Sequence, residues 1–289
     1  MEKREVYRRL EQYYDRYQFS IQANESLYNP WSIMSFFKLP KNAFINYWFE
    51  SGSISSLIMQ YLKINEKFDF LNYTDREVYI SNKDLSNHYE INAIPHEIFL
   101  YQVGYLTIEK SQNNTAHLIM PNAEVEDSLL NLYLVGNKLK PKNDTQLLID
   151  EIYKYIDKRD LPVIIKIFNG ILNDCVSILS KIFQDERSVR DLIYAALPQE
   201  IYLEKIKERE SAKGWSDLEL ITRQTHMVIE FKRTNPNRKP EECLKETVEQ
   251  IKCKEYGIGA FERCNLYRVA MVISTEKRKI LPDFCMEVV

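Results

Sequence analysis

The chain has 289 residues, of which 45% are hydrophobic and 28% charged, and its formal net charge is -3. This composition is typical of a folded protein with one large or two ordinary domains, and it excludes a disordered chain. The near-neutral balance also excludes a general basic field for nucleic acid or anionic membrane, so an anionic partner needs a local binding patch.

Other global features point to a protein of the cytoplasm. The five cysteines form no CxxC pair and the four histidines have no ligand spacing, so reduced thiols fit better than structural zinc. The amino terminus, MEKREVYRRL, lacks the apolar core of a signal peptide. The longest apolar run, LPVIIKIFNGIL, is too short and too interrupted to span a bilayer, so we expect no membrane partner.

Residues 1 to about 65 are predicted to be helical. Asn29 is expected to cap a helix that has Pro30 at its first position, and another helix is expected after Ser53. Many Tyr, Trp and Phe residues lie along these helices. We interpret this aromatic stripe as core, with a base-stacking platform as the alternative.

Residues 83–122 predict two short helices followed by a hairpin that turns at Asn113 and Asn114. This order resembles a winged-helix element, which can bind DNA or a protein. The second helix carries Glu97 and few cations, which favours a spacer or a docking module for a protein partner over DNA reading. The polar stretch GNKLKPKNDT (136–145) is the best linker candidate and predicts domains at 1–142 and 143–289.

The second domain is predicted to be a mixed α/β fold. Three helices are expected in QLLIDEIYKYI, LPVIIKIFNGILNDC and ERSVRDLIYAAL, and three strands in EIYLEKIKERES, DLELIT and MVIEFKR. KPEECLKETVEQIKCKEY then predicts a helix, and the apolar run LYRVAMVIS a buried central strand.

Three polar residues stand out in this sheet: Asp217, Glu230 and Lys232. Side chains alternate along a strand, so Glu230 and Lys232 project to the same face. If the two strands pair through the turn near 223–225, Asp217 comes to lie beside them at one edge of the sheet. Two close carboxylates repel each other and have raised pKa values, a penalty that a divalent cation removes.

Oxygen ligands of this kind suit Mg²⁺, which would activate a water molecule and neutralise a phosphodiester. Lys232 would orient that water or stabilise developing negative charge. The alternative is an ordinary exposed Glu–Lys pair on a strand. The flanking residues Val228, Ile229 and Phe231 predict a mostly buried strand, in which charged groups need a reason.

The arrangement resembles the PD-(D/E)XK nuclease superfamily, whose hallmark is an Asp on one strand and Glu-x-Lys on the next. More narrowly, the chain is similar to the bacterial group in which an AAA-ATPase-like region precedes such a nuclease domain. Seven segments carry this likeness: YNPWSI (28–33), NYWFESG (46–52), GYLTIE (104–109), PNAEV (121–125), ERESAKGWSDLEL (208–220), VIEFKR (228–233) and VEQIKCKEYG (248–257).

The likeness covers most of the chain but has two departures. No GxxxxGK[ST] motif is present, so the ATPase core is missing and residues 1–142 resemble only a remnant of the ATPase-like region. Gly214 is followed by Trp215 where the family tends to have arginine, which removes a cation beside the site.

The resemblance implies a restriction-endonuclease-like mixed sheet flanked by helices, and a role for each matching residue. Asp217, Glu230 and the backbone carbonyl of Phe231 would be metal ligands, with Lys232 as the catalytic cation. Glu210 would add a ligand or hold water, with a solvated turn residue as the alternative.

Seven further residues are candidates for contact with the substrate. Gln250 and Tyr256 match the family's QI…Y helix and would line the substrate groove, although packing or capping roles are equally open. Five basic residues could bind phosphates: Lys252, Lys254, Arg233, Arg238 and Lys239. From Glu200 onward, however, 17 basic residues stand against 16 acidic ones, so strong nonspecific DNA binding is not implied.

The sequence thus predicts a Mg²⁺-dependent nuclease, with Mn²⁺ as an alternative metal, that cleaves DNA or, as the second choice, RNA. The competing hypothesis is a catalytically inactive nuclease-like module that binds protein in a toxin–antidote or effector system. The expected location is the bacterial cytoplasm, or a host cell if the protein is a delivered effector.

Overall fold

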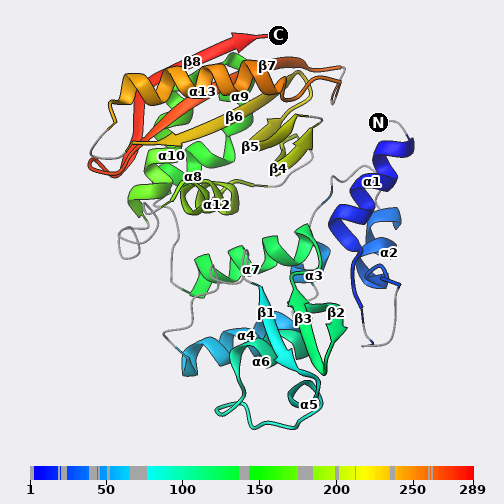
Figure 1. Cartoon of the computed structure of the whole chain (residues 1–289). Coiled ribbons are helices and arrows are strands. Elements are labelled where there is room, and N and C mark those ends of the chain that lie inside the picture. Colours follow the sequence, from blue (N-terminus) through cyan, green and yellow to red (C-terminus); the bar gives the residue numbers. More distant parts are fainter. Residues whose placement is uncertain are drawn as a thin grey trace. The chain divides into compact units, whose positions relative to one another are not determined.

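The structure is a computed structural model of the chain (Figure 1). It describes residues 3–289 except 19, 21–24, 39–43, 45, 51–52, 66–76, 137–142, 175–184, 199–201, 212, 235–237, 260 and 262. The chain forms two compact units, Met1–Lys138 and Leu139–Val289. Most of the predicted linker lies outside the described residues, and the boundary placed from sequence at 142/143 stays a prediction.

The described part of the first unit contains helices and a small sheet. Its helices are α1 (Lys3–Tyr14), α2 (Pro30–Lys38), α3 (Tyr47–Glu50), α4 (Ser53–Ile64), α5 (Asn82–Leu85), α6 (His96–Gln102) and α7 (Ala123–Gly136). Its strands are β1 (Val78–Ser81), β2 (Thr107–Gln112) and β3 (Thr115–Ile119), paired in the order β1-β3-β2.

Local sequence signals explain how two of these elements begin or turn. The Asn29 side chain accepts hydrogen bonds from the backbone N–H groups of Trp31 and Ser32, at 3.0 and 3.3 Å, which confirms the predicted cap of α2. The hairpin β2–β3 turns at Asn113 and Asn114, whose φ angles are 51° and 62°. Asparagine tolerates this left-handed backbone better than most residues, so the predicted turn is explained. The winged-helix likeness of this element, and its expected role as a spacer or protein-docking module, stay predictions.

Aromatic side chains form a core cluster in this unit. Tyr14 packs with Tyr13, Phe36 and Phe44, and all four rings are buried. The interpretation of the aromatic stripe as core is therefore confirmed for these rings. It was wrong for Trp31 and Phe37, which are 58% and 59% exposed on α2.

The second unit has five described helices and a five-stranded sheet. Its described helices are α8 (Asn143–Asp150), α9 (Ile152–Lys158), α10 (Leu161–Asp174), α12 (Glu186–Ala196) and α13 (Pro240–Lys254). Its strands are β4 (Glu204–Ser211), β5 (Gly214–Ile221), β6 (Thr225–Arg233), β7 (Asn265–Ser274) and β8 (Lys279–Val288). The predicted helix QLLIDEIYKYI is broken at Glu151, and β8 was not predicted.

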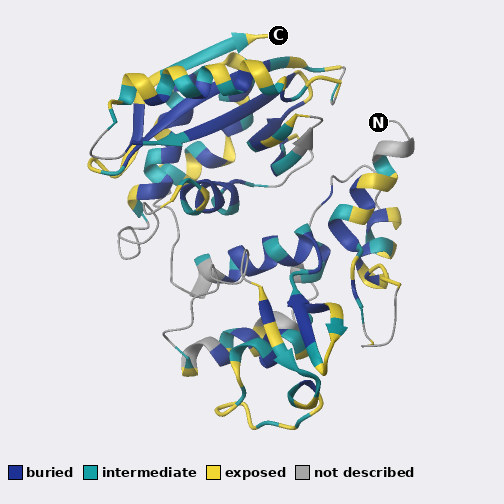
Figure 2. Cartoon of the chain, viewed as in Figure 1, coloured by how far each residue is buried: buried dark blue, intermediate teal, exposed yellow. Residues whose placement is uncertain are grey.

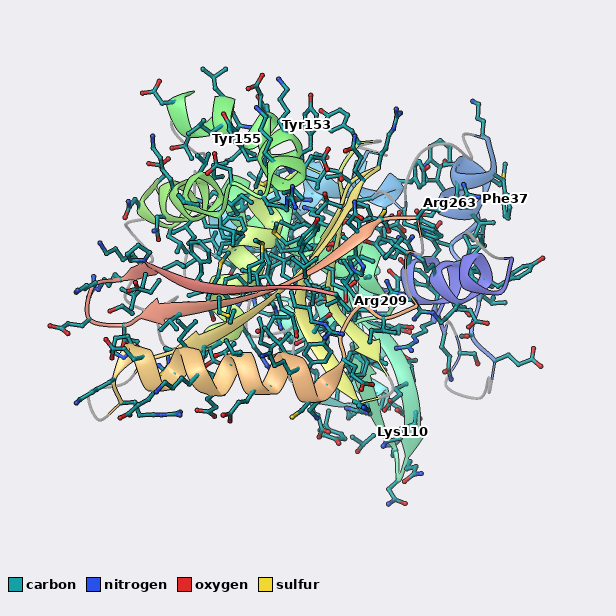
Figure 3. The ribbon with its side chains drawn as sticks, turned by 90° about the horizontal axis from the view of Figure 1, so that it is seen from above. Phe37, Lys110, Tyr153, Tyr155, Arg209 and Arg263 are labelled. Atoms are coloured by element: carbon teal, nitrogen blue, oxygen red, sulfur yellow. The ribbon has the colours of Figure 1, made fainter. Side chains whose placement is uncertain are left out.

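The sheet has the order β4-β5-β6-β7-β8, and only β6 and β7 run parallel. Helix α13 connects these two parallel strands and covers one face of the sheet, while α8, α9, α10 and α12 lie on the other (Figures 1 and 3). The predicted mixed α/β architecture is therefore confirmed.

Burial follows from this layering. Strands β6 and β7 have neighbours on both edges and helices on both faces, so they are buried along most of their length (Figure 2). Their apolar runs fit this position, which is typical of central strands. Of the described helices, none combines the length and hydrophobicity needed to cross a bilayer.

Candidate active site

The pairing of strands β5 and β6 ends beside Asp217 and Glu230. It runs from Ile221 opposite His226 to Leu218 opposite Ile229. One step further, the Asp217 carboxylate accepts the backbone N–H of Phe231 through Oδ2 at 2.8 Å. The Asp217 side chain thus accepts a hydrogen bond from a β6 backbone N–H that lies beyond the last β5–β6 residue pair. Asp217 also lies beside Glu230, as the sequence predicted.

Glu230 is only 4% exposed and its carboxylate is half satisfied. The side-chain amide of Gln250, on α13, donates a hydrogen bond to Oε1. Among the described residues Oε2 has no hydrogen-bond partner. An unpaired buried carboxylate oxygen is costly, and this oxygen is therefore available to a cation.

The two carboxylates hold protons more tightly than free side chains do. Burial and the neighbouring Asp217 charge raise the pKa of Glu230 to about 8, against the opposing effects of the Asp217 backbone N–H and of Lys232. Burial raises the pKa of Asp217 to about 6, although the Phe231 N–H and the Arg190 guanidinium favour its ionised form. A bound cation would relieve the cost of ionising both groups.

Lys232 lies two residues beyond Glu230 on β6, and its side chain is 24% exposed. Its ammonium lies 3.7 Å from Oε1 of Glu246 on α13. Gln250 of the same helix contacts Glu230, so both strand residues are contacted from α13. This arrangement supports the predicted common face of Glu230 and Lys232.

The motif is thus a buried glutamate, a partly buried aspartate and a lysine where two strands of a mixed α/β sheet stop pairing. Residues 184–282 match the family model of the PD-(D/E)XK nuclease superfamily. The match runs from the beginning of α12 into β8, and the sheet is consistent with the restriction-endonuclease-like fold of this superfamily. Comparisons with curated proteins and with solved structures return no match.

Members of the PD-(D/E)XK superfamily are usually nucleases and typically use divalent metals such as Mg²⁺. The described residues contain no group of three or more His, Cys, Asp or Glu side chains arranged for a metal. Two carboxylates are nevertheless sufficient for Mg²⁺, which keeps several waters and accepts phosphate oxygens. The unpaired Oε2 of Glu230 and the raised pKa of Asp217 fit such an ion.

Tyr256 lies in the same region of the second unit as Gln250. It is 2% exposed, and its pKa is raised by burial and by the charge of Glu230. A Cβ at Gly214 would lie 3.3 Å from the Tyr256 hydroxyl and 3.2 Å from Nζ of Lys254. Glycine is favoured here chiefly because Gly214 has a φ of 146°, a backbone conformation that side-chain-bearing residues rarely adopt.

The remaining predicted residues are less closely tied to the acids. The backbone N–H of Arg233 donates to Glu186, and Lys252 is exposed on α13 with no recorded contact to the acidic pair among the described residues. Glu210 lies in β4 opposite Trp215, and its side chain is outside the described residues.

Two residues on α12 were missed by the sequence reasoning. Glu186 is in the first turn of α12, and its charge raises the pKa of both Asp217 and Glu230. Arg190 is 4% exposed and lies 3.8 Å from Oδ1 of Asp217 and 2.7 Å from Oε1 of Glu208. The available signal was their spacing of four residues, which places an acid and an arginine on one face of an amphipathic helix.

Proposed function

We propose that the second unit is a Mg²⁺-dependent nuclease that hydrolyses phosphodiester bonds of DNA, with RNA as the alternative substrate. The observation that carries this proposal is the buried, half-satisfied Glu230 beside Asp217, within a segment that matches a nuclease superfamily. Stability alone does not account for a buried glutamate beside a partly buried aspartate when the ionised forms of both are disfavoured.

Each residue of the site has a distinct role in this proposal. Asp217 and Glu230, with the backbone carbonyl of Phe231, would hold the metal, which activates water and neutralises phosphate charge when bound. Lys232 would contact the phosphate and stabilise negative charge that develops on it. Gln250 fixes the orientation of the Glu230 carboxylate through its amide. Arg190 places a positive charge against Asp217 and restrains that side chain.

The direct test is cleavage by the purified full chain. Supercoiled plasmid, short single strands and short RNAs are incubated with Mg²⁺, Mn²⁺ or EDTA. We expect metal-dependent cleavage that is lost in Asp217→Asn and Lys232→Ala. The proposal fails if the wild type cleaves none of these substrates, or if cleavage persists in both variants and in EDTA.

A nuclease-like module that binds protein is the competing proposal. It is supported by the near-equal numbers of acidic and basic residues from Glu200 onward and by Trp215, which is 54% exposed. In the first unit, Trp31, Met34 and Phe37 are exposed at three-residue intervals along α2, a face suited to a protein partner. Calorimetry separates the two proposals, because Mn²⁺ binding that is lost in Glu230→Gln supports the nuclease.

A further inference from the structure

One carboxylate lies between two cations beside the acidic pair. Oε1 of Glu246 is 3.7 Å from the Lys232 ammonium, and Oε2 contacts the guanidinium of Arg238. Glu246 therefore contacts one cation with each oxygen. A single negative group spread over two oxygens and held by a lysine and an arginine has the chemistry of a bound phosphodiester.

The geometry of α13 explains why Glu246 reaches this position. Glu246 and Gln250 are separated by one helical turn, which spans about 6 Å along the axis. Lys232 and Glu230 are two residues apart on β6, about 6.6 Å along the strand. These near-equal spacings let one face of α13 contact both strand residues, Gln250 at Glu230 and Glu246 at Lys232.

The side chains of Lys232, Arg238 and Glu246 are partly exposed, and this exposure sets the strength of their ion pairs. The exposed fractions are 24% for Lys232, 37% for Arg238 and 44% for Glu246. Water screens ion pairs at this exposure, so they are weak and can exchange partners. A substrate phosphate can therefore displace Glu246 without disrupting a buried structure.

We propose that Lys232 and Arg238 form a binding site for a backbone phosphate of nucleic acid, which Glu246 occupies until the substrate displaces it. This inference rests on the proposed function, since it assigns the substrate phosphate that reaches Lys232. Of the basic residues that the sequence offered for phosphate binding, it selects Arg238 as the partner of Lys232, and it adds Glu246 as a competing internal anion. Glu246 thereby lowers the affinity of the free protein for nucleic acid.

The test measures binding in the absence of cleavage. A fluorescein-labelled single strand of 20 nucleotides is titrated with the full chain in EDTA at low salt, and anisotropy gives the Kd. Glu246→Gln removes the competing charge, so we expect the Kd to fall about fivefold. Arg238→Ala in the Glu246→Gln background should return the Kd to the wild-type value or above.

Glu249→Gln is the matched control, because Glu249 is exposed on the same helix and carries the same charge. Its Kd should change by less than about twofold, since its loss affects only the general field. Equal tightening in both variants, or no tightening in Glu246→Gln, would overturn the inference. Thermal unfolding followed by circular dichroism checks that each variant is folded.

Failure of this inference is distinguishable from failure of the proposed nuclease. If the wild type cleaves DNA with Mg²⁺ but Glu246→Gln binds no more tightly in EDTA, only the competing role of Glu246 is lost. If no metal supports cleavage while Glu246→Gln still tightens binding through Arg238, the phosphate site stands without the nuclease.

Discussion

The two units each bury a glutamate, and the two glutamates differ in how they are satisfied. Glu124, at the beginning of α7, is fully buried, and burial raises its pKa to about 7. The Ser32 hydroxyl lies 2.9 and 2.7 Å from its two oxygens, and the backbone N–H of Trp48 donates to Oε1 at 2.9 Å. Glu124 thereby connects α2, α3 and α7.

Glu230 in the second unit is also buried, but one of its oxygens has no partner among the described residues. Its near neighbour is another acid, Asp217, whose charge raises the pKa of Glu230 further. A raised pKa alone therefore does not separate a structural acid from a functional one. The hydrogen bonds of the two acids differ, since both oxygens of Glu124 are satisfied within the fold and Oε2 of Glu230 is not, and this difference supports the proposal that Glu230 is the functional acid.

Replacement by glutamine should abolish activity at Glu230 but not at Glu124, and this is the largest expected effect. Glu230→Gln keeps the shape but removes a metal-binding charge, so cleavage should fall by about 100-fold or more. Glu124→Gln should leave the cleavage rate within about twofold of the wild type, because it lies in the other unit. Initial rates on plasmid with Mn²⁺ provide the comparison. Equal loss of activity in both variants would contradict the distinction.

Removal of the carboxylate at Glu124 should strongly destabilise the first unit. Glu124→Ala leaves the Ser32 hydroxyl and the Trp48 N–H buried without their acceptor, which costs about 3 kcal/mol of unfolding free energy. Hydrogen exchange read by mass spectrometry reports each unit separately. We expect protection to decrease in α2, α3 and α7 and to be unchanged in β5, β6 and β7. Uniform loss across both units would argue against a local role.

In the absence of metal, Glu230→Gln should stabilise the second unit. At pH 8 the wild-type pair carries charge that burial disfavours, so the neutral variant should gain about 1 kcal/mol of unfolding free energy. Added Mn²⁺ should raise the melting temperature of the wild type and not that of the variant. Differential scanning calorimetry with and without Mn²⁺ measures both effects. A variant less stable than the wild type without metal would show that Glu230 is structural, like Glu124.

Local patterns predicted the acidic pair better than its surroundings. The alternation of side chains in MVIEFK was enough to place Glu230 and Lys232 together, and the polar turn at 223–225 was enough to bring Asp217 beside them. Contacts between a helix and a sheet depend on packing angles that no local pattern contains, so Glu186, Arg190 and Glu246 were not assigned to the site. The sequence did not identify the role of Glu124 for the same reason, since its hydrogen-bond partners lie 76 and 92 residues away along the chain.

The pH dependence of stability is the smallest of these effects, and it tests whether the pKa of Glu124 is raised in the folded chain. Glu124 ionises at about 7 in the folded chain instead of at its ordinary value of 4.5. Between these values the folded state holds a proton that the unfolded state has released, so stability decreases as pH rises through this window. Between pH 6 and 7 the unfolding free energy should fall by about 1 kcal/mol more in the wild type than in Glu124→Gln. Urea titrations followed by hydrogen exchange in α7 measure this difference. Parallel pH profiles for the two proteins would mean that Glu124 has an ordinary pKa. The hydrogen bonds to its carboxylate would then offset the effect of burial on that pKa.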